Sequence, residues 1–244
     1  RHLLIKRAPE IKLPGLMRVM LAGAAASGDH RTSYTGYARF ALLNVLKVLG
    51  LRRGDRILVP AYICDVVLLP FAELGIEPVY YRVTPDFQVD WESVEAKAGS
   101  RAFISVNYFG VSQDFGAIAD FCARHGLVWL NDNAHGFASR AGERSLEEFG
   151  DFSFTSFRKV IGSLNGGRGR INNDRFLPLK GELDRLNTGV PESRQRYLAA
   201  ATLRTAGIRL RALPDFSDPR GFSEDGLKGY RVDALAVRQL GACD

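Results

Sequence analysis

Short apolar runs alternate along this chain with segments whose apolar residues recur at helical spacing. The apolar runs are residues 56–60, 78–83, 102–109, 127–132 and 151–157, and the helical segments are residues 38–49, 64–74, 90–96 and 114–125. This alternation predicts βαβ units with right-handed crossovers and a mostly parallel sheet. We therefore expect an α/β fold with three layers, α/β/α.

Chemically active side chains follow two of the predicted strands. Asp132 and His135 lie two and five residues after the apolar run LVWL, and Lys159 lies two residues after the run FSFTSF. Parallel strands bring their carboxyl ends to one edge of a sheet, where ligands bind. We therefore expect these three side chains to face one crevice, although they are well separated in sequence.

The length and charge of the chain narrow its possible partners. Its 244 residues suit a single α/β domain, or one domain and part of another. The net charge of +6 could indicate a nucleic-acid partner, but the excess is arginine spread along the chain, without a basic run or a base-stacking motif. We expect no nucleic-acid partner; the charge can instead attract an anionic cofactor and a nucleotide-linked substrate.

The cysteines and the lengths of the apolar runs indicate the cellular compartment of the protein. Cys64, Cys122 and Cys243 have neither CxxC spacing nor matching histidine pairs, so we expect no metal site and no disulfide framework. No apolar run reaches the roughly 18 residues that a membrane span needs. We expect a cytoplasmic protein without a membrane partner.

Three motifs carry a resemblance to a known family. The segment NDNAHGFAS (131–139) resembles the Asp-x-Ala-His/Gln element of the DegT/DnrJ/EryC1/StrS sugar aminotransferases. The segment GDFSFTSFRKVIGSLNGG (150–167) resembles their Schiff-base lysine segment, and residues 34–83 resemble their N-terminal helix–strand–helix–strand. Family members are fold-type I enzymes that use pyridoxal 5′-phosphate (PLP), so the resemblance implies an aspartate aminotransferase-like large domain.

The resemblance assigns roles to the residues after the strands. Lys159 would be the catalytic lysine that forms a Schiff base with PLP and then acts as a base. Asp132 would keep the pyridine nitrogen protonated, and His135 would stack on the ring or bond near its phenolic oxygen. The plainer alternatives are a surface lysine, an aspartate that caps a turn, and an ordinary histidine.

The phosphate would be held at a helix start. Arg39 and Phe40 match the positions whose backbone N–H groups bind it, and Ser156 matches a hydroxyl that binds it. The alternatives are that Phe40 only fills the core and that Ser156 is only a strand residue. Tyr62 and Cys64 fall near the position of the ring-stacking aromatic residue in relatives, without a decision between them.

The glycine pair 166–167 matches a site of close backbone approach that leaves no room for a side chain. A turn for its own sake is the alternative. Two departures from the family pattern are Arg168 after this pair and Gly229, where relatives often carry asparagine.

The expected domain organisation has three parts. Residues 1–33 form an N-terminal segment, residues 34–173 the core of the PLP-binding large domain, and residues 174–244 a helical extension. The segment 230–240 resembles the one that precedes the small C-terminal domain in the family, so we expect that domain to be absent or truncated.

The resemblance implies a homodimeric aminotransferase that moves an amino group from an amino acid such as glutamate to a keto-sugar, itself nucleotide-linked. Two alternatives stay open at this point. One is another PLP-dependent reaction of the lyase or desulfurase type, which would use the same cofactor residues. The other is an inactive, shortened paralogue with a binding role.

Overall fold

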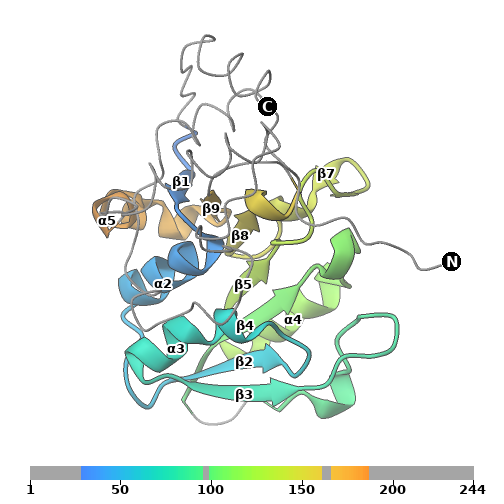
Figure 1. Ribbon diagram of the computed structural model, residues 1–244. Helices are drawn as coiled ribbons and strands as arrows, with labels where there is room; N and C mark the ends of the chain where they lie inside the picture. Colours follow the sequence, from blue (N-terminus) through green and yellow to red (C-terminus); the bar gives the residue numbers. More distant parts are fainter. Residues whose placement is uncertain (1–28, 96–98, 161–165, 187–244) are drawn as a thin grey trace, which may run out of the picture.

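The computed structural model describes residues 29–95, 99–160 and 166–186, and the statements below concern these residues (Figure 1). The described part is an α/β unit built around one seven-stranded sheet with the order β1-β9-β8-β5-β4-β2-β3. The expected helices at 193–212 and from 232 onward lie outside the described residues.

The central sheet is mostly parallel, as the alternation predicted. Its strands are β1 (Thr32–Thr35), β2 (Arg56–Pro60), β3 (Glu77–Tyr81), β4 (Ser100–Val106), β5 (Val128–Asp132), β8 (Phe152–Ser156) and β9 (Gly167–Ile171). The strands β2, β3, β4, β5 and β8 run parallel, and β9 is antiparallel to both of its neighbours. A separate two-stranded sheet joins β6 (Arg140–Ala141) and β7 (Arg144–Ser145).

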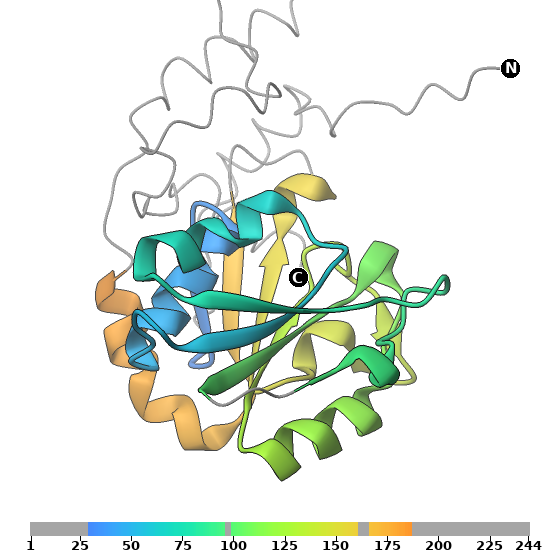
Figure 2. The same ribbon diagram turned by 90° about the horizontal axis from the view of Figure 1, so that it is seen from below.

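Helices cover both faces of the sheet. The α-helices are α2 (Ala38–Val48), α3 (Leu69–Leu74), α4 (Phe115–His125) and α5 (Lys180–Leu186), and 3₁₀ turns span Asp65–Val67, Trp91–Ser93, Tyr108–Gly110, Leu146–Glu148, Phe157–Lys159 and Asp174–Leu179. The helices α2, α3 and α5 share one apolar core with the sheet, and α4 packs in a second core on the other face (Figure 2). The three-layer architecture is therefore confirmed.

The period-2 alternation of strand side chains separates these two cores. Ile57 and Val59 of β2 point to the core under α2, whereas Leu58 between them points to the core under α4. All three side chains are completely buried. An apolar run buried on both faces is what a central parallel strand requires.

Helix α4 shows how the sequence sets element ends. The Asp114 carboxylate accepts a hydrogen bond from the Ala117 N–H at 3.0 Å, and so satisfies a donor that the first turn leaves unpaired. The helix ends at Gly126, whose φ of 64° is the left-handed conformation that glycine adopts readily. The boundaries predicted for this helix are confirmed.

Two predicted helices are shorter in the structure. Residues 64–74 divide into a 3₁₀ turn and α3, because Pro70 lacks an N–H and suits only a helix start. Within the described residues, the helix predicted at 90–96 is a 3₁₀ turn, Trp91–Ser93, capped by the Asp90 side chain, which accepts a hydrogen bond from the Glu92 N–H.

The strands β1 and β9 were not predicted from the sequence. Strand β9 begins with glycine and has another at Gly169, and glycine argues against a strand by propensity. A Cβ at position 169 would lie 3.1 Å from the Ala41 Cβ of α2. Close packing of α2 on β9 therefore explains why position 169 is glycine, the residue that made this strand hard to predict from the sequence.

The strand order places a crevice at one edge of the sheet. From β2 the chain adds β3 on one side and then β4 on the other, so the order reverses between β2 and β4. At such a switch point the connections leave in opposite directions and open a space beyond the carboxyl ends of the strands.

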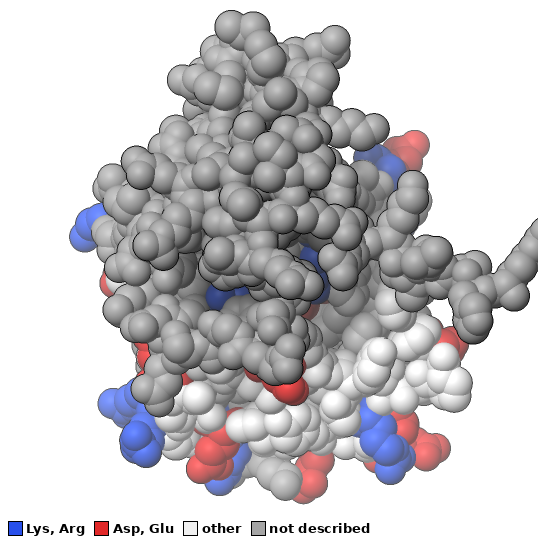
Figure 3. Space-filling view, in the orientation of Figure 1, with Lys and Arg blue, Asp and Glu red and all other residues white. Residues whose placement is uncertain are grey.

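Over the face seen in Figure 3, the visible basic and acidic side chains are interspersed rather than gathered by sign.

Candidate active site

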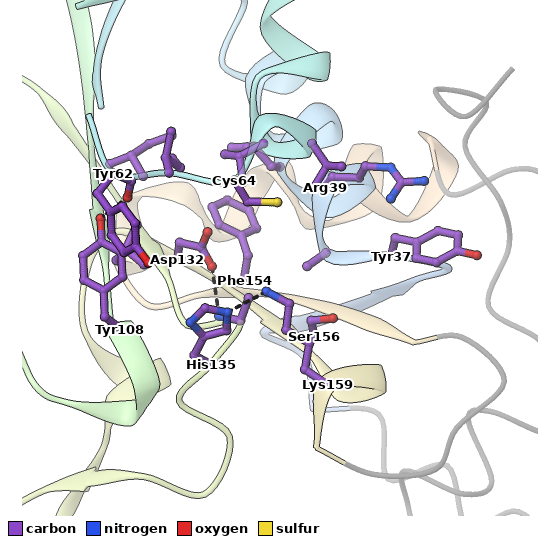
Figure 4. Close-up of a pocket in the computed structure, with 18 of the residues that line it drawn as sticks. Tyr37, Arg39, Tyr62, Cys64, Tyr108, Asp132, His135, Phe154, Ser156 and Lys159 are labelled. Carbon is purple, nitrogen blue, oxygen red and sulfur yellow. Dashed lines mark hydrogen bonds between the residues drawn. The ribbon is translucent and has the colours of Figure 1, made fainter. Parts of the chain in front are cut away.

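A cavity of about 550 Å³ opens at the carboxyl edge of the sheet. Segments that follow β2, β4, β5 and β8 line it together with the start of α2. The lining residues used below are Tyr37, Arg39, Tyr62, Cys64, Tyr108, Phe109, Asp132, His135, Phe154, Ser156 and Lys159 (Figure 4). The crevice predicted from the strand ends therefore exists, and it holds the three side chains expected in it.

Lys159 and His135 are in direct contact inside the cavity. Strand β8 ends at Ser156, and the 3₁₀ turn after it directs Lys159 back toward the end of β5. The Lys159 Nζ atom lies 2.9 Å from His135 Nε2. Desolvation lowers the pKa of His135, and the Lys159 charge lowers it further, against an opposite effect of Asp132. The neutral imidazole that results can accept a hydrogen bond from the lysine through Nε2.

Asp132 is the last residue of β5 and directs its carboxylate into the cavity (Figure 4). Its Oδ1 atom accepts a hydrogen bond from the Ala134 N–H at 2.9 Å. Burial raises the pKa of Asp132, while Lys159, this N–H and His135 act in the opposite direction. A desolvated carboxylate with raised proton affinity is suited to pairing with a cationic group in the cavity.

The start of α2 reaches the cavity through only one of the two residues expected there. Arg39 lines the cavity, with its guanidinium carbon 4.4 Å from the centre of the Tyr37 ring. The Phe40 N–H donates to the Tyr37 carbonyl at 2.9 Å, and the Phe40 side chain is buried in the core. The Phe40 side chain thus fills the core, whereas phosphate binding by its backbone N–H stays a prediction.

Ser156 and the glycine pair lie beside this helix start. Ser156 lines the cavity, three residues before Lys159. A Cβ at position 167 would lie 2.3 Å from the Ala38 N atom, and the Gly166 N–H donates to the Gly36 carbonyl at 2.9 Å. The backbone of β9 therefore lies directly against the first turn of α2, and the prediction of a close backbone approach is confirmed.

Behind β8, on the side away from the cavity, lies a polar network that the sequence analysis missed. Arg168 forms an ion pair with Glu147, and the Glu147 carboxylate accepts a longer hydrogen bond of 3.4 Å from Thr155. Asn133 donates to Thr155 at 3.4 Å and accepts from Asn107 at 2.9 Å. We call these five residues the rear network. The asparagines directly after β4 and β5 were its only signal in the sequence.

The described residues contain no cluster of three or more histidine, cysteine or acidic side chains able to hold a metal ion. In the same part of the chain, no helix combines the length and the apolar character needed to cross a bilayer.

Comparisons with known proteins identify the family of this chain. The model of the DegT/DnrJ/EryC1/StrS aminotransferase family matches residues 33–184. GDP-perosamine synthase of Vibrio cholerae is 29% identical over 142 residues, which are 56% of this chain and 39% of that protein. The UDP-2-acetamido-2-deoxy-3-oxo-D-glucuronate aminotransferase of Pseudomonas aeruginosa is 32% identical over 143 residues, 56% of this chain and 40% of that protein.

The chain thus spans about two fifths of the length of these curated relatives. Among solved structures, the aminotransferase TlmJ from Streptoalloteichus hindustanus has a TM-score of 0.68 at 17% identity, over 97% of this chain and 64% of that one. This likeness supports the fold of a PLP-dependent transferase large domain. Since the family model matches more than half of its residues, the chain belongs to the DegT/DnrJ/EryC1/StrS aminotransferase family.

Proposed function

We propose that this protein is a PLP-dependent aminotransferase that transfers an amino group from an amino acid such as glutamate to a keto-sugar carried on a nucleotide. The observation that supports this proposal most directly is the cavity in which Lys159, His135 and Asp132 meet. The relatives from Vibrio cholerae and Pseudomonas aeruginosa are named for nucleotide-linked sugars, which supports the substrate class.

The residues in the cavity fit PLP by their chemistry. Among the described residues that line the cavity, Lys159 is the only lysine, so one primary amine is available for the cofactor aldehyde. Asp132 offers a desolvated carboxylate for the pyridinium nitrogen. The start of α2 and the Ser156 hydroxyl offer donors for the phosphate, where β9 approaches closely because Gly167 lacks a side chain.

The chemistry that PLP supplies when bound is an electron sink for the carbon that carries the transferred amino group. Asp132 would maintain this capacity, because its negative charge favours a protonated ring nitrogen. The Nζ atom of Lys159 would take up and return the proton at that carbon. His135, held neutral beside Lys159, would orient this amine through the contact at 2.9 Å.

The proposal extends to an assembly. Family resemblance suggests a homodimer with sites at the interface, and closed two-fold dimers are the commonest homo-oligomers. Sedimentation of the purified protein would measure its mass directly.

The proposed activity is tested by adding PLP to the purified protein and recording its absorption spectrum. We expect a new band near the visible edge that disappears on reduction with borohydride, with the reduced adduct on the peptide that contains Lys159. Lys159→Arg should abolish both the band and the adduct, because a guanidinium retains the charge but stays protonated. Lys47→Arg is the matched control, since Lys47 forms an ion pair with Glu73 away from the cavity.

A protein that folds but shows neither band nor adduct would disprove the proposal. With the band established, exposure to glutamate should shift the spectrum and release 2-oxoglutarate. Release of sulfur or cleavage of a side chain from an amino-acid substrate would instead identify a lyase or desulfurase.

A further inference from the structure

Four aromatic side chains form a continuous wall beside the cavity. They are Tyr62 after β2, Phe87 in the loop after β3, and Tyr108 and Phe109 after β4. Tyr62 and Tyr108 have ring centres 5.5 Å apart, and Phe87 lies 5.5 Å from Tyr108 and 5.3 Å from Phe109. We call this group the aromatic wall.

Two members of the wall have a backbone conformation that residues other than glycine rarely adopt. Phe87 has a φ of 65° and Phe109 a φ of 53°. Asparagine or glycine would adopt this left-handed region more easily than a bulky aromatic residue. Such conformations persist where the surrounding structure enforces them, and they cluster at ligand-binding sites.

Hydrogen bonds between two loops enforce this arrangement. The Gln113 side chain donates to the Phe87 carbonyl at 2.7 Å, and the Gln88 side chain donates to the Ser112 carbonyl at 3.1 Å. The Gln88 side chain also accepts from the Asp114 N–H at 3.1 Å. The loop after β3 is thus tied to the loop after β4, so the wall is a built feature of the fold.

The outer members of the wall expose their rings at the cavity. Tyr62 and Phe109 both line the cavity, yet they remain 59% and 66% exposed. The Phe109 ring also stacks on the His135 imidazole, with ring centres 5.7 Å apart and planes inclined by 20°. The wall therefore extends from the contact with Lys159 and His135 to the exposed rim.

We infer that the aromatic wall is the subsite that receives the nucleobase of the substrate, with Phe109 and Tyr62 as the residues that stack on it. This inference rests on the proposed function, in which the reacting keto-sugar lies at Lys159. The base is the planar aromatic part of a nucleotide-linked sugar, and it lies away from the reacting carbon. Exposed aromatic faces bind such a ring by stacking, whichever base it carries.

The test is nucleotide binding to the PLP-loaded protein, measured by calorimetry with UDP, GDP and dTDP as probes. We expect Phe109→Leu to weaken binding of at least one of these nucleotides about tenfold, the effect of losing one good aromatic contact. Leucine is as disfavoured as phenylalanine at this φ, so backbone strain is matched between the two proteins. Phe109→Trp should restore the affinity, because an indole also stacks.

Tyr80→Leu is the matched control. Tyr80 is 51% exposed on the edge strand β3 and does not line the cavity, so its replacement should leave nucleotide affinity unchanged. The PLP absorption band should be equal in all these variants, which shows that Lys159 and Asp132 are intact.

Two results would overturn the inference. One is a PLP-loaded protein that binds none of the three nucleotides, and the other is equal nucleotide affinity for the wild type and Phe109→Leu. If the second result comes with weaker self-association of Phe109→Leu in sedimentation, the wall is instead a contact between copies of the chain. Both results leave a PLP-dependent aminotransferase standing, although the first removes the nucleotide from its proposed substrate; absence of the PLP band removes the function itself.

Discussion

The two sides of strand β8 differ in whether their buried charged groups are paired. On the cavity side, Phe154 and Ser156 face the space that holds Asp132 and Lys159. On the other side, Ser153 and Thr155 bond to Glu147, which is paired with Arg168. The period-2 alternation of one short strand thus separates the cavity from the rear network.

The difference lies in how each carboxylate is compensated. The side chains of Glu147 and Arg168 are only 17% and 10% exposed, and they neutralise each other directly. Asp132 takes part in none of the ion pairs within 4.0 Å among the described residues, and burial raises its pKa. A paired buried charge supports the fold, whereas a poorly compensated one remains available to a ligand at a cost in stability.

The largest predicted effect is on activity. Asp132→Asn keeps the shape of the side chain but removes the charge that would hold the cofactor nitrogen protonated. If the proposed function is right, conversion of the PLP-loaded protein by glutamate should slow about a thousandfold, equivalent to ~4 kcal/mol of barrier. Stopped-flow absorbance measures this rate.

The same variant, Asp132→Asn, should lose activity without losing stability. Because the folded pKa of Asp132 is raised, its contribution to stability falls as the pH rises from the usual aspartate range through the raised value. Above the usual aspartate range the raised pKa of Asp132 therefore reduces stability, and Asp132→Asn should melt at the same temperature as the wild type or higher. A clear fall in melting temperature would place Asp132 with the structural charges and break the comparison.

The next largest effect concerns the rear network. Glu147→Gln leaves the Arg168 guanidinium buried without its counter-ion, which should lower the free energy of unfolding by about 3 kcal/mol. Urea denaturation measures this change. The control is Glu77→Gln, which removes the exposed partner of Arg56 and should cost less than ~1 kcal/mol.

The double variant Glu147→Leu/Arg168→Leu sharpens this prediction. With both charges removed, neither is left uncompensated, so much of the lost stability should return. A double variant as unstable as Glu147→Gln would show that packing, rather than the ion pair, stabilises this side of β8.

The smallest predicted effect is a titration inside the cavity. Desolvation and the Lys159 charge lower the pKa of His135 below the usual histidine value of 6.5. Lys159→Gln should therefore raise it, and NMR titration of the imidazole would detect the change. The lowered value means that His135 contributes stability above the usual histidine pKa, which is lost as the pH falls through 6.5 toward the folded value. An unchanged pKa in Lys159→Gln would show that the contact at 2.9 Å does not persist in solution.

Local chemistry determined much of what the sequence revealed. Asp114 and Gly126 bound α4 because a capping carboxylate and a left-handed glycine act within one turn. The apolar runs identified the parallel strands, and Asp132 and Lys159 could be placed at one edge because parallel strands end there together. Those inferences needed only the local rules for helix ends and apolar runs, together with the fact that parallel strands end at one edge of a sheet.

Only the tertiary structure decided the features that depend on contacts between distant segments. Strand β9 was not predicted because it contains glycines, which are needed where α2 packs closely against it. Arg168 forms an ion pair with Glu147, which is distant in sequence, so no sequence spacing predicts the pair. The aromatic wall likewise joins loops that follow three different strands. A sequence records which residues prefer to be buried or to turn, but contacts made across the sheet form only when the whole fold brings those residues together.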